Sequence, residues 1–505
     1  MVEETPELTG GRLLARNTLF NLIGQGAPIL IALFAIPILI KSLGTDRFGV
    51  LTLAWVVIGY FSLFDFGLGR ALTKLVAEKL GAGNEREIPS IVWTTLLLMM
   101  FFGLAGAVTL GLLSNWLIRH VLKVPEILKT ETLHSFYLLA FSIPIVITTA
   151  GLRGVLEAKQ RFELVNIVRI FMGAFTYLGP LFVLPFSRSL FSVVVVLVIG
   201  RFLACFVHLI LCFRVMPSLR HDLAINQSMV KPLIYFGGWM TITNVIGPFM
   251  VYLDRFLISA LVSVKAVAYY TIPYEMITKL LIIPGALTGV LLPVFSTSYA
   301  QNSRETIELF ARVVKYTFLL VFPITLSIVI FAREGLGLWI DDEFARNSAF
   351  VLQLLTIGVF IISMSQIFFV LLQSIGRPDI TAKLNLVEFP FYLFFAWLLI
   401  GDYGIKGAAL IWVIRILIDA ALLLVITVLV LPKSASPIRG ISIMVSVSLI
   451  IFCVACSIEG FVAKSIFLFW TLVSFIIFVW FRLLSSEERM VVKDHIRRRV
   501  RTILI

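Results

Sequence analysis

The chain has 505 residues, of which 60% are hydrophobic and 14% are charged, and its mean hydropathy is +1.02. Soluble globular domains of this length do not have such a composition, so we expect a membrane-embedded protein. The sequence holds no long polar stretch that would fold as a separate soluble catalytic or nucleotide-binding domain. Its net charge of +13 lies mostly in loops between apolar segments, which favours membrane orientation and contact with anionic lipid over nucleic-acid binding.

Apolar runs that are long enough to cross a bilayer recur along the chain. They predict an all-α polytopic membrane protein with about fourteen transmembrane helices, at about 20 residues per ~30 Å of hydrocarbon. The predicted spans lie near residues 17–40, 48–68, 91–117, 133–152, 166–186, 190–213, 234–261, 266–295, 314–331, 349–374, 384–400, 405–431, 441–458 and 465–484. The loops between them are expected to be short.

The distribution of basic residues predicts the orientation of these spans. Loops on one side, counted with the C-terminal tail, carry roughly 26 Lys and Arg residues, and the opposite loops carry roughly 11. The richer side is expected to face the cytoplasm, and an even number of spans places both termini there. The N-terminus carries Glu3, Glu4 and Glu7 and lacks the basic region of a signal peptide, so the first span is predicted to be retained.

Two halves of the chain resemble each other in the order of their segments. The segment beginning at Ser42 resembles the one beginning at Ala260, and Arg161 onward resembles Arg377 onward at nearly the same offset. Six spans per unit predict two parallel repeats around a central cavity, related by an axis along the membrane normal. The predicted domains are an N-lobe at 12–215, a C-lobe at 232–431, two extra spans within 441–484, and a tail at 485–505. The tail is predicted to be a basic amphipathic helix on anionic lipid.

Charged residues inside the predicted spans indicate a polar path through the membrane, because a charge near the midplane is costly. Arg201 and Arg415 fall at equivalent places in the two repeats. A guanidinium matches phosphate oxygens well, so one interpretation is a cationic chamber for an anionic headgroup. The alternative is structural pairing: Asp419 lies one turn from Arg415, whereas Arg201 has only Leu197 and Cys205 at those spacings.

Further ionisable residues lie within or near the predicted spans. Glu275 and Lys279 are four residues apart. Asp254 and Arg255 are neighbours and do not face each other, so at least one needs a partner elsewhere. Glu388 lies near the cytoplasmic end of its span, where a solvated helix end explains it. Buried carboxylates can bind a coupling proton, and structural ion pairs are the alternative.

Patterns for metal or catalytic chemistry are weak. Cys453-x-x-Cys456 has metal-ligand spacing, but no second pair or nearby His accompanies it, so packing is the favoured interpretation. The GxG within 65–70 follows a membrane helix and not a strand, which excludes a dinucleotide-binding turn. His208 falls well inside a span, and we expect it to be a packing residue. No cofactor, no metal and no enzymatic activity are predicted.

Several segments resemble Wzx-type polysaccharide flippases. They begin at Asn17, Phe236, Tyr269, Leu372 and Gly404, and the resemblance covers roughly residues 12–431. That family belongs to the multidrug/oligosaccharidyl-lipid/polysaccharide exporter superfamily. The resemblance implies two six-helix lobes, alternating access, and transfer of an oligosaccharide on undecaprenyl diphosphate from the cytoplasmic to the outer leaflet. The extra C-terminal pair is similar to that of lipid II flippases, where extra helices help form a lipid groove.

The resemblance and the buried charges together give a predicted site. The substrate-binding residues, which attract the diphosphate headgroup, are predicted to be Arg201, Arg415, Lys279 and Arg255. The candidates for coupling to H⁺ or Na⁺ are Asp254, Glu275, Asp419 and Glu388. The implied partners are the lipid-linked oligosaccharide, anionic membrane lipid, and polysaccharide polymerase and glycosyltransferase machinery. The implied location is the cytoplasmic membrane of a bacterium or archaeon.

Other functions stay open at this stage. A lipid II-like flippase or a multidrug/cation antiporter would share the superfamily, although a cation site should be net acidic. A membrane glycosyltransferase or polymerase would need catalytic carboxylates in a sizeable outer loop. The largest outer loops, 119–132 and 332–347, are short, but Glu334, Asp341, Asp342 and Glu343 keep that alternative open.

Overall fold

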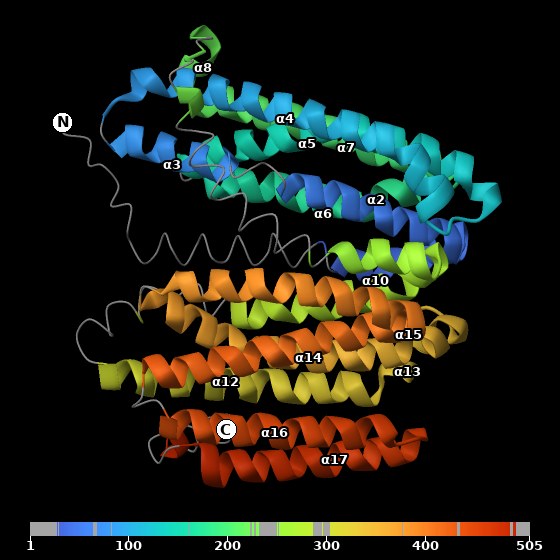
Figure 1. Ribbon diagram of the computed structural model, residues 1–505, viewed down its shortest axis with the longest axis vertical. Helices are drawn as coiled ribbons and strands as arrows, with labels where there is room; N and C mark the ends of the chain where they lie inside the picture. The colour runs from blue at the N-terminus through green and yellow to red at the C-terminus, as the bar shows by residue number, and fades with distance from the viewer. Residues whose placement is uncertain are drawn as a thin grey trace, which may run out of the picture. The chain divides into compact units, whose positions relative to one another are not determined.

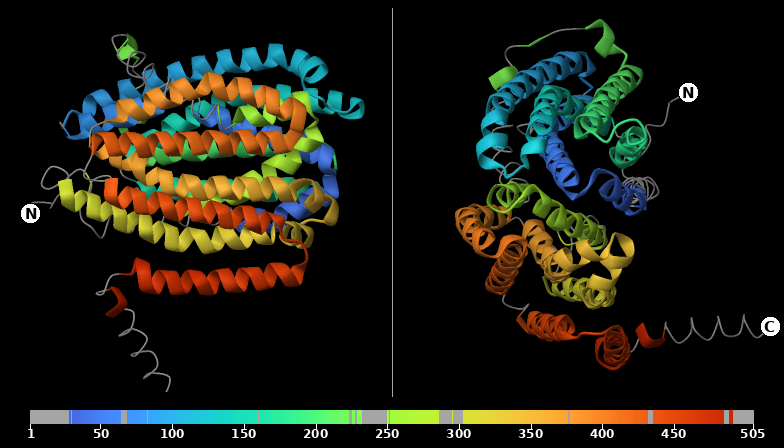
Figure 2. Two further views of the ribbon diagram at one scale, coloured as in Figure 1. Left: turned by 60° about the horizontal axis from the view of Figure 1, so that its bottom comes forward. Right: turned by 90° about the vertical axis from the view of Figure 1, so that its right-hand side faces the viewer.

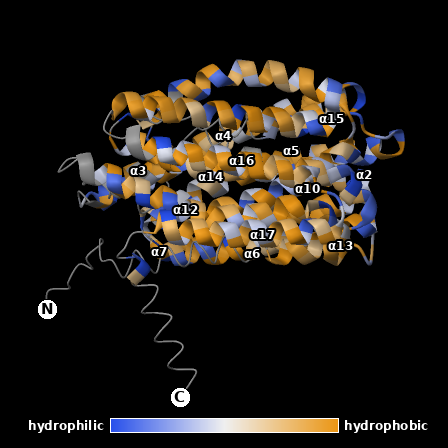
Figure 3. Ribbon diagram, turned by 90° about the horizontal axis from the view of Figure 1, so that it is seen from below, coloured by the Kyte–Doolittle hydropathy of each residue, from blue (hydrophilic) through white to orange (hydrophobic). Residues whose placement is uncertain are grey.

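The described part of the chain is almost entirely helical and contains no strand. The computed structural model describes residues 28, 30–63, 68–81, 83–159, 161–222, 225–226, 229–231, 250, 252–285, 295, 303–375, 377–431, 435–484 and 488–490. Within them, nine helices are long and apolar enough to cross a bilayer. Figure 3 shows hydrophobic residues along the middle of the helices and hydrophilic residues near their ends. The chain is therefore a multi-pass membrane protein.

The described helices pack into two compact units, the first drawn from residues 1–272 and 382–411. Within it, α4, α5, α6 and α7 run side by side (Figures 1 and 2), and α5 also contacts α2 and α3. Its helices are Leu30–Leu43, α2 (Thr45–Leu63), α3 (Leu68–Gly81), α4 (Ile88–Trp116), α5 (Glu126–Ala158), α6 (Phe162–Val183), α7 (Leu190–Val215), the short α8 (Ser218–His221), the start of α10 (Val264–Thr278) and the part of α15 (Pro378–Val430) within 382–411. A 3₁₀ turn spans Glu85–Glu87, and a π-helical turn spans Leu117–Val121.

Small residues let the helices of the first unit approach each other closely, as is common in membrane proteins. A Cβ placed on Gly151 of α5 would lie 2.7 Å from the sulfur of Met99 in α4. One placed on Gly154 would lie 2.9 Å from the backbone oxygen of Gly69 in α3. The Thr73 hydroxyl of α3 also donates to the Gly154 carbonyl at 3.2 Å. α5 is thereby fixed between α3 and α4.

The second unit is drawn from residues 273–381 and 412–505. Its helices are the end of α10 with the 3₁₀ turn Lys279–Leu281, α12 (Ser303–Ile330), α13 (Ala332–Trp339), α14 (Asp342–Ser374), the second part of α15 (Pro378–Val430), α16 (Ala435–Ser457) and α17 (Phe461–Phe478), followed by the π-helical turn Val479–Leu483. α12 contacts α14, α16 and α17. The Phe322 ring of α12 packs against Phe360, Phe452 and Phe475 at centroid distances of 6.2, 5.7 and 5.0 Å. This aromatic cluster joins the two C-terminal helices to the unit.

The element α15 contains two helices that meet at Gly404. This residue has φ 58° and ψ −136°, a left-handed conformation that glycine adopts without steric cost. The sequence predicts a break between spans 384–400 and 405–431, and Gly404 lies at that break. The long helix therefore covers two predicted spans.

For the helices, the structure corrects one prediction, and several other predictions fall on residues that it does not describe. The predicted loop after the second span contains the helix α3, in which Leu68, Leu72 and Val76 are buried. Most of the predicted span 234–261, parts of the spans 17–40 and 266–295, and the tail beyond residue 490 lie outside the described residues. The predicted lobe boundaries and the exact number of fourteen spans stay predictions.

Candidate functional site

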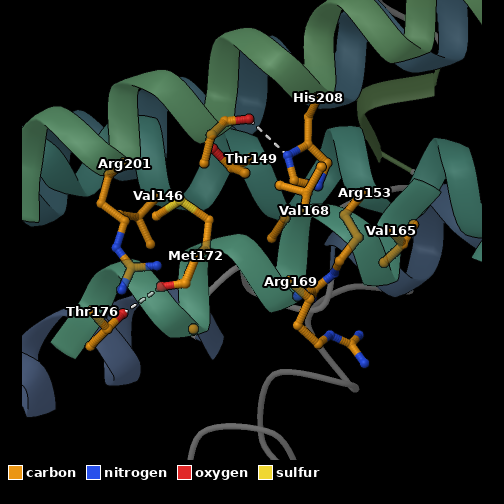
Figure 4. Close-up of a pocket in the computed structure, with 13 residues that line it drawn as sticks. Val146, Thr149, Arg153, Val165, Val168, Arg169, Met172, Thr176, Arg201 and His208 are labelled. Carbon is orange, nitrogen blue, oxygen red and sulfur yellow. Dashed lines mark hydrogen bonds between the residues drawn. The ribbon is translucent and has the colours of Figure 1, made fainter. Parts of the chain in front are cut away.

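A cavity of about 260 Å³ lies between α5, α6 and α7 in the first unit (Figure 4). Each helix contributes one arginine to its lining: Arg153 from α5, Arg169 from α6 and Arg201 from α7. The remaining lining residues are apolar or uncharged, namely Val146, Thr149, Ala150, Val165, Val168, Met172, Gly173, Thr176, Ala204 and His208. No acidic residue is among the described residues that line it. This excess of positive charge favours an anionic ligand.

Arg201 lies in the middle of α7, and its side chain points into this cavity near Thr176 (Figure 4). No hydrogen bond or ion pair joins it to another described residue. The Thr176 hydroxyl donates to the Met172 carbonyl at 2.8 Å. Gly200, which precedes Arg201, allows the close approach of α6, because a Cβ there would lie 2.5 Å from Cε1 of Phe175. Arg201 is therefore a partly buried cation whose donors stay available within the described structure.

The other two arginines have local partners. The Nη1 of Arg169 donates to Oδ1 of Asn166 at 3.2 Å, and Nδ2 of Asn166 donates to the Phe162 carbonyl at 2.9 Å. The Nε of Arg153 lies 3.5 Å from Oε1 of Glu157, one turn further along α5. Both arginines lie near the end of the unit where α5 ends and α6 begins. Each retains donors, because a guanidinium has five N–H groups.

Arg153 and Arg169 are not among the site residues predicted from the sequence. Arg153 lies directly after the predicted span 133–152, where a basic residue indicates the cytoplasmic end of a span. The sequence does hold one signal for Arg169, namely that a charged residue lies three residues inside the predicted span 166–186. His208, predicted to be a packing residue, is buried, and its Nδ1 lies 2.8 Å from the Ala204 carbonyl. The same ring also forms part of the cavity wall.

Asp254 and Arg255 are both fully buried in the first unit. The Tyr270 hydroxyl donates to Oδ2 of Asp254 at 2.5 Å, and the Arg255 backbone N–H donates to its Oδ1 at 2.8 Å. The Arg255 guanidinium lies 5.3 Å from the centroid of the Tyr252 ring, in cation–π geometry. Neither residue lines the arginine cavity. Their roles in substrate binding and ion coupling stay predictions.

The interpretation of Glu388 as a solvated helix end is wrong. Its side chain lies on α15 and is only 9% exposed, and Tyr392, one turn further on, is also buried. Apolar length alone does not show which face of a helix packs inside the protein. Its role in ion coupling stays a prediction.

The remaining predicted residues belong to the second unit. Lys279 and Glu275 form an ion pair at 3.3 Å, and both side chains are partly exposed. Arg415 and Asp419 lie one turn apart on α15, close enough for their charges to interact. The first unit contributes the whole described lining of the arginine cavity. The predicted cooperation of Lys279 and Arg415 with Arg201 therefore stays a prediction.

Two acidic residues considered for the transferase alternative have structural roles. The Lys464 ammonium donates to both carboxylate oxygens of Glu334, at 2.8 and 3.0 Å. Asp341 caps α14, because its Oδ1 accepts from the Phe344 backbone N–H at 2.7 Å. The described residues contain no group of three or more His, Cys, Asp and Glu side chains suited to hold a metal ion. The four cysteines are free thiols.

Comparison with known proteins identifies the family of the chain. The sequence profile of a family described as "Polysaccharide biosynthesis protein" matches residues 14–299. The chain belongs to this family. It is 32% identical over 419 residues to a Shigella flexneri protein assigned as an O-antigen transporter, covering 81% of this chain and 96% of that protein. It is also 23% identical over 405 residues to a Haloferax volcanii protein assigned as a low-salt glycan biosynthesis flippase, covering 77% of each.

Solved structures confirm the predicted fold for this member of the polysaccharide biosynthesis family. An inward-facing multidrug MATE transporter of the MOP superfamily matches with a TM-score of 0.69 at 14% identity, over 83% of this chain and 98% of that one. The lipid II flippase MurJ in an inward closed conformation matches with a TM-score of 0.66 at 13% identity, over 92% and 99%. The chain has the fold of this exporter superfamily, and the predicted resemblance to Wzx-type flippases is confirmed.

Proposed function

We propose that the protein is a flippase that moves a lipid-linked oligosaccharide from the cytoplasmic to the outer leaflet of a membrane. Membership of the polysaccharide biosynthesis family supports this proposal, as do the assigned functions of the Shigella and Haloferax relatives. The carrier is proposed to be undecaprenyl diphosphate, whose polyprenyl chain stays in lipid while the charged headgroup crosses through the protein. Rocking of residues 12–215 against residues 232–431 would expose the headgroup to each side in turn.

The observation that carries the proposal is Arg201 in the α5–α6–α7 cavity. An arginine in the middle of an apolar helix is costly unless a partner compensates its charge. No described residue supplies that partner, and Arg153 and Arg169 add positive charge to the same cavity. A diphosphate supplies oxygens that suit forked guanidinium donors. The cavity is therefore suited to the charged link between a glycan and its lipid.

A cation or drug antiporter of the same superfamily is disfavoured by the polarity of this cavity. A cation site requires negative charge, whereas the described lining holds three arginines and no carboxylate. A membrane transferase is also disfavoured, because Glu334 and Asp341 are engaged in an ion pair and a helix cap. Transport of an anionic lipid headgroup agrees with both observations.

The wider setting follows from the proposed transport. We place the protein in the cytoplasmic membrane of a bacterium or archaeon, with both termini in the cytoplasm. Glycosyltransferases would build its substrate on the cytoplasmic side, and a polymerase would use the product on the other side. Proton or sodium coupling would act through the acidic candidates Asp254, Glu275, Asp419 and Glu388.

A cellular experiment tests the proposed function. The chain would be expressed in a bacterium that lacks its own flippase but assembles a compatible lipid-linked glycan. Wild-type protein should restore glycan export, whereas Arg201→Ala should cause lipid-linked glycan to accumulate. Arg214→Ala is the matched control, because Arg214 is exposed near the end of the same helix and does not line the cavity. Normal export by Arg201→Ala at wild-type protein levels would contradict the role of Arg201.

A further inference from the structure

The three cavity arginines lie at two depths along their helices. A short connection joins the end of α5 to the start of α6, so these two ends lie on the same side of the unit. A second short connection joins α6 to α7, so α7 runs back and ends on that side too. At 1.5 Å per residue, Arg153 lies about 8 Å from the end of α5 and Arg169 about 10 Å from the start of α6. Arg201 lies about 21 Å from the end of α7. Arg153 and Arg169 therefore form an outer pair, and Arg201 lies deeper.

The two levels also differ in their contacts. Arg153 and Glu157 have side-chain exposures of 43% and 31%, so solvent weakens their 3.5 Å ion pair. Asn166 is almost fully buried and holds Arg169 through a 3.2 Å hydrogen bond. Arg201 has no such partner among the described residues. The outer arginines are oriented by neighbours that leave most of their donors available, whereas the deeper arginine has all of its donors available.

We propose that Arg153 and Arg169 form a separate capture site for a phosphoryl group, from which the headgroup passes inward to Arg201. This inference rests on the proposed function and assigns an order to its steps. The connection between α5 and α6 lies on the predicted cytoplasmic side, where the substrate is assembled. A phosphoryl group that arrives there binds Arg169, which Asn166 already orients, and displaces Glu157 from Arg153. It then exchanges to Arg201 further along the same cavity.

The two levels should affect different kinetic quantities. Exposed charges at a mouth mainly speed the association of a charged ligand, and salt screens them. A charge-assisted hydrogen bond in a less solvated place is stronger and holds the ligand during the conformational change. Loss of an outer arginine should therefore raise the KM for lipid-linked substrate, while loss of Arg201 should lower the maximal rate.

Substitution of Glu157 should change the KM in the opposite direction to substitution of an outer arginine. Its carboxylate competes with the phosphoryl group for Arg153 and repels that group directly. Glu157→Gln should therefore lower the KM, whereas a purely structural role of the ion pair would not improve substrate capture. The same substitution leaves Arg201 unchanged, so the maximal rate should stay near the wild-type value.

The experiment uses the full chain in proteoliposomes and a fluorescently labelled polyprenyl-diphosphate disaccharide. Initial rates of transfer between leaflets are measured against substrate mole fraction at low and high salt. We expect Arg153→Gln and Arg169→Gln each to raise KM about tenfold or more at low salt, given the strength of hydrogen bonds to charged groups. The increase should shrink at high salt, and the exposed control Arg214→Gln should behave as wild type. Outer variants that lower the maximal rate at unchanged KM would overturn the proposal.

Binding of inorganic pyrophosphate separates failure of this proposal from failure of the proposed function. Pyrophosphate should stabilise purified wild-type protein against heat, and this effect should require higher concentrations in both outer variants. If the wild type binds pyrophosphate through Arg153 and Arg169 but moves no lipid, the capture site stands and the flippase function fails. If transport occurs but both outer variants bind pyrophosphate like Arg214→Gln, the capture site is refuted while the transport function remains.

Discussion

Gly103 of α4 packs directly against Pro144 of α5: a Cβ placed on Gly103 would lie 2.6 Å from the Cα of Pro144. The contact is with backbone, so a rotamer change cannot relieve it. Val146 and Thr149, which follow on α5, line the arginine cavity. The spacing of α4 and α5 therefore helps to set the position of one cavity wall.

Gly103→Ala should destabilise the protein, because the added methyl group must separate the two helices. Overpacking of this kind costs about 1–3 kcal/mol. Gly111→Ala is the matched control on the same helix, since a Cβ there meets nothing within 4 Å. Thermal unfolding in detergent should show a lower Tm for Gly103→Ala only. Equal Tm values for the two variants would contradict the close contact.

The helical fold was predictable because hydrocarbon thickness imposes a length and an apolar composition on each span. The predicted span 190–213 corresponds to α7 at Leu190–Val215, and the span 349–374 lies within α14 at Asp342–Ser374. The break at Gly404 was also predicted. α3 was missed because its apolar residues alternate with Lys74, Glu78 and Lys79, so no long apolar run marks it.

The site was only partly predictable, because side-chain direction depends on helix packing. Arg201 was identified from its depth in an apolar run. Arg153 and Arg169 lie near span ends, where arginine commonly reaches water, so depth alone gave no reason to place them in a cavity. Glu388 shows the converse. It lies near a span end, where a solvated side chain is expected, but on a face of the helix that is buried. The repeat drew attention to Arg415 instead, which belongs to the second unit.

Lys464→Met should lower the stability of the C-terminal helices. Lys464 is 8% exposed and its ammonium donates to both carboxylate oxygens of Glu334, so its loss leaves a carboxylate without this partner. Breaking a buried pair costs about 3–5 kcal/mol, and the 28% exposure of Glu334 should reduce this cost. The loss should appear as a lower midpoint of thermal unfolding.

The exposed pair of Lys129 and Glu126 supplies the control for Lys464. Glu126 is 85% exposed, so Lys129→Met should change stability by at most about 1 kcal/mol. The double variant Lys464→Met with Glu334→Leu should recover part of the stability lost by the single variant. Equal effects of Lys464→Met and Lys129→Met would show that the buried pair has no special role.

Tyr270→Phe should destabilise the first unit by removing one hydrogen bond to a buried carboxylate. The Tyr270 hydroxyl lies 2.5 Å from Oδ2 of Asp254, and both residues are fully buried. Loss of such a bond costs about 1–3 kcal/mol. Tyr403→Phe is the control, because that ring is 64% exposed. The denaturation midpoint of each variant is measured with a chemical denaturant and compared with that of the wild type. An unchanged midpoint for Tyr270→Phe would argue against the hydrogen bond to Asp254.

The central claim is that the cavity around Arg201 carries a diphosphate-linked glycan across the membrane. The most direct measurement is leaflet-resolved transfer of a labelled polyprenyl-diphosphate oligosaccharide in proteoliposomes that contain the purified chain. Wild-type protein and Arg214→Gln should transfer the lipid well above the rate of protein-free vesicles. Arg201→Gln at equal reconstitution should fall by about tenfold or more, as expected for loss of a charge-assisted bond. Transfer by Arg201→Gln at the wild-type rate, or no transfer by the wild type, would contradict the account.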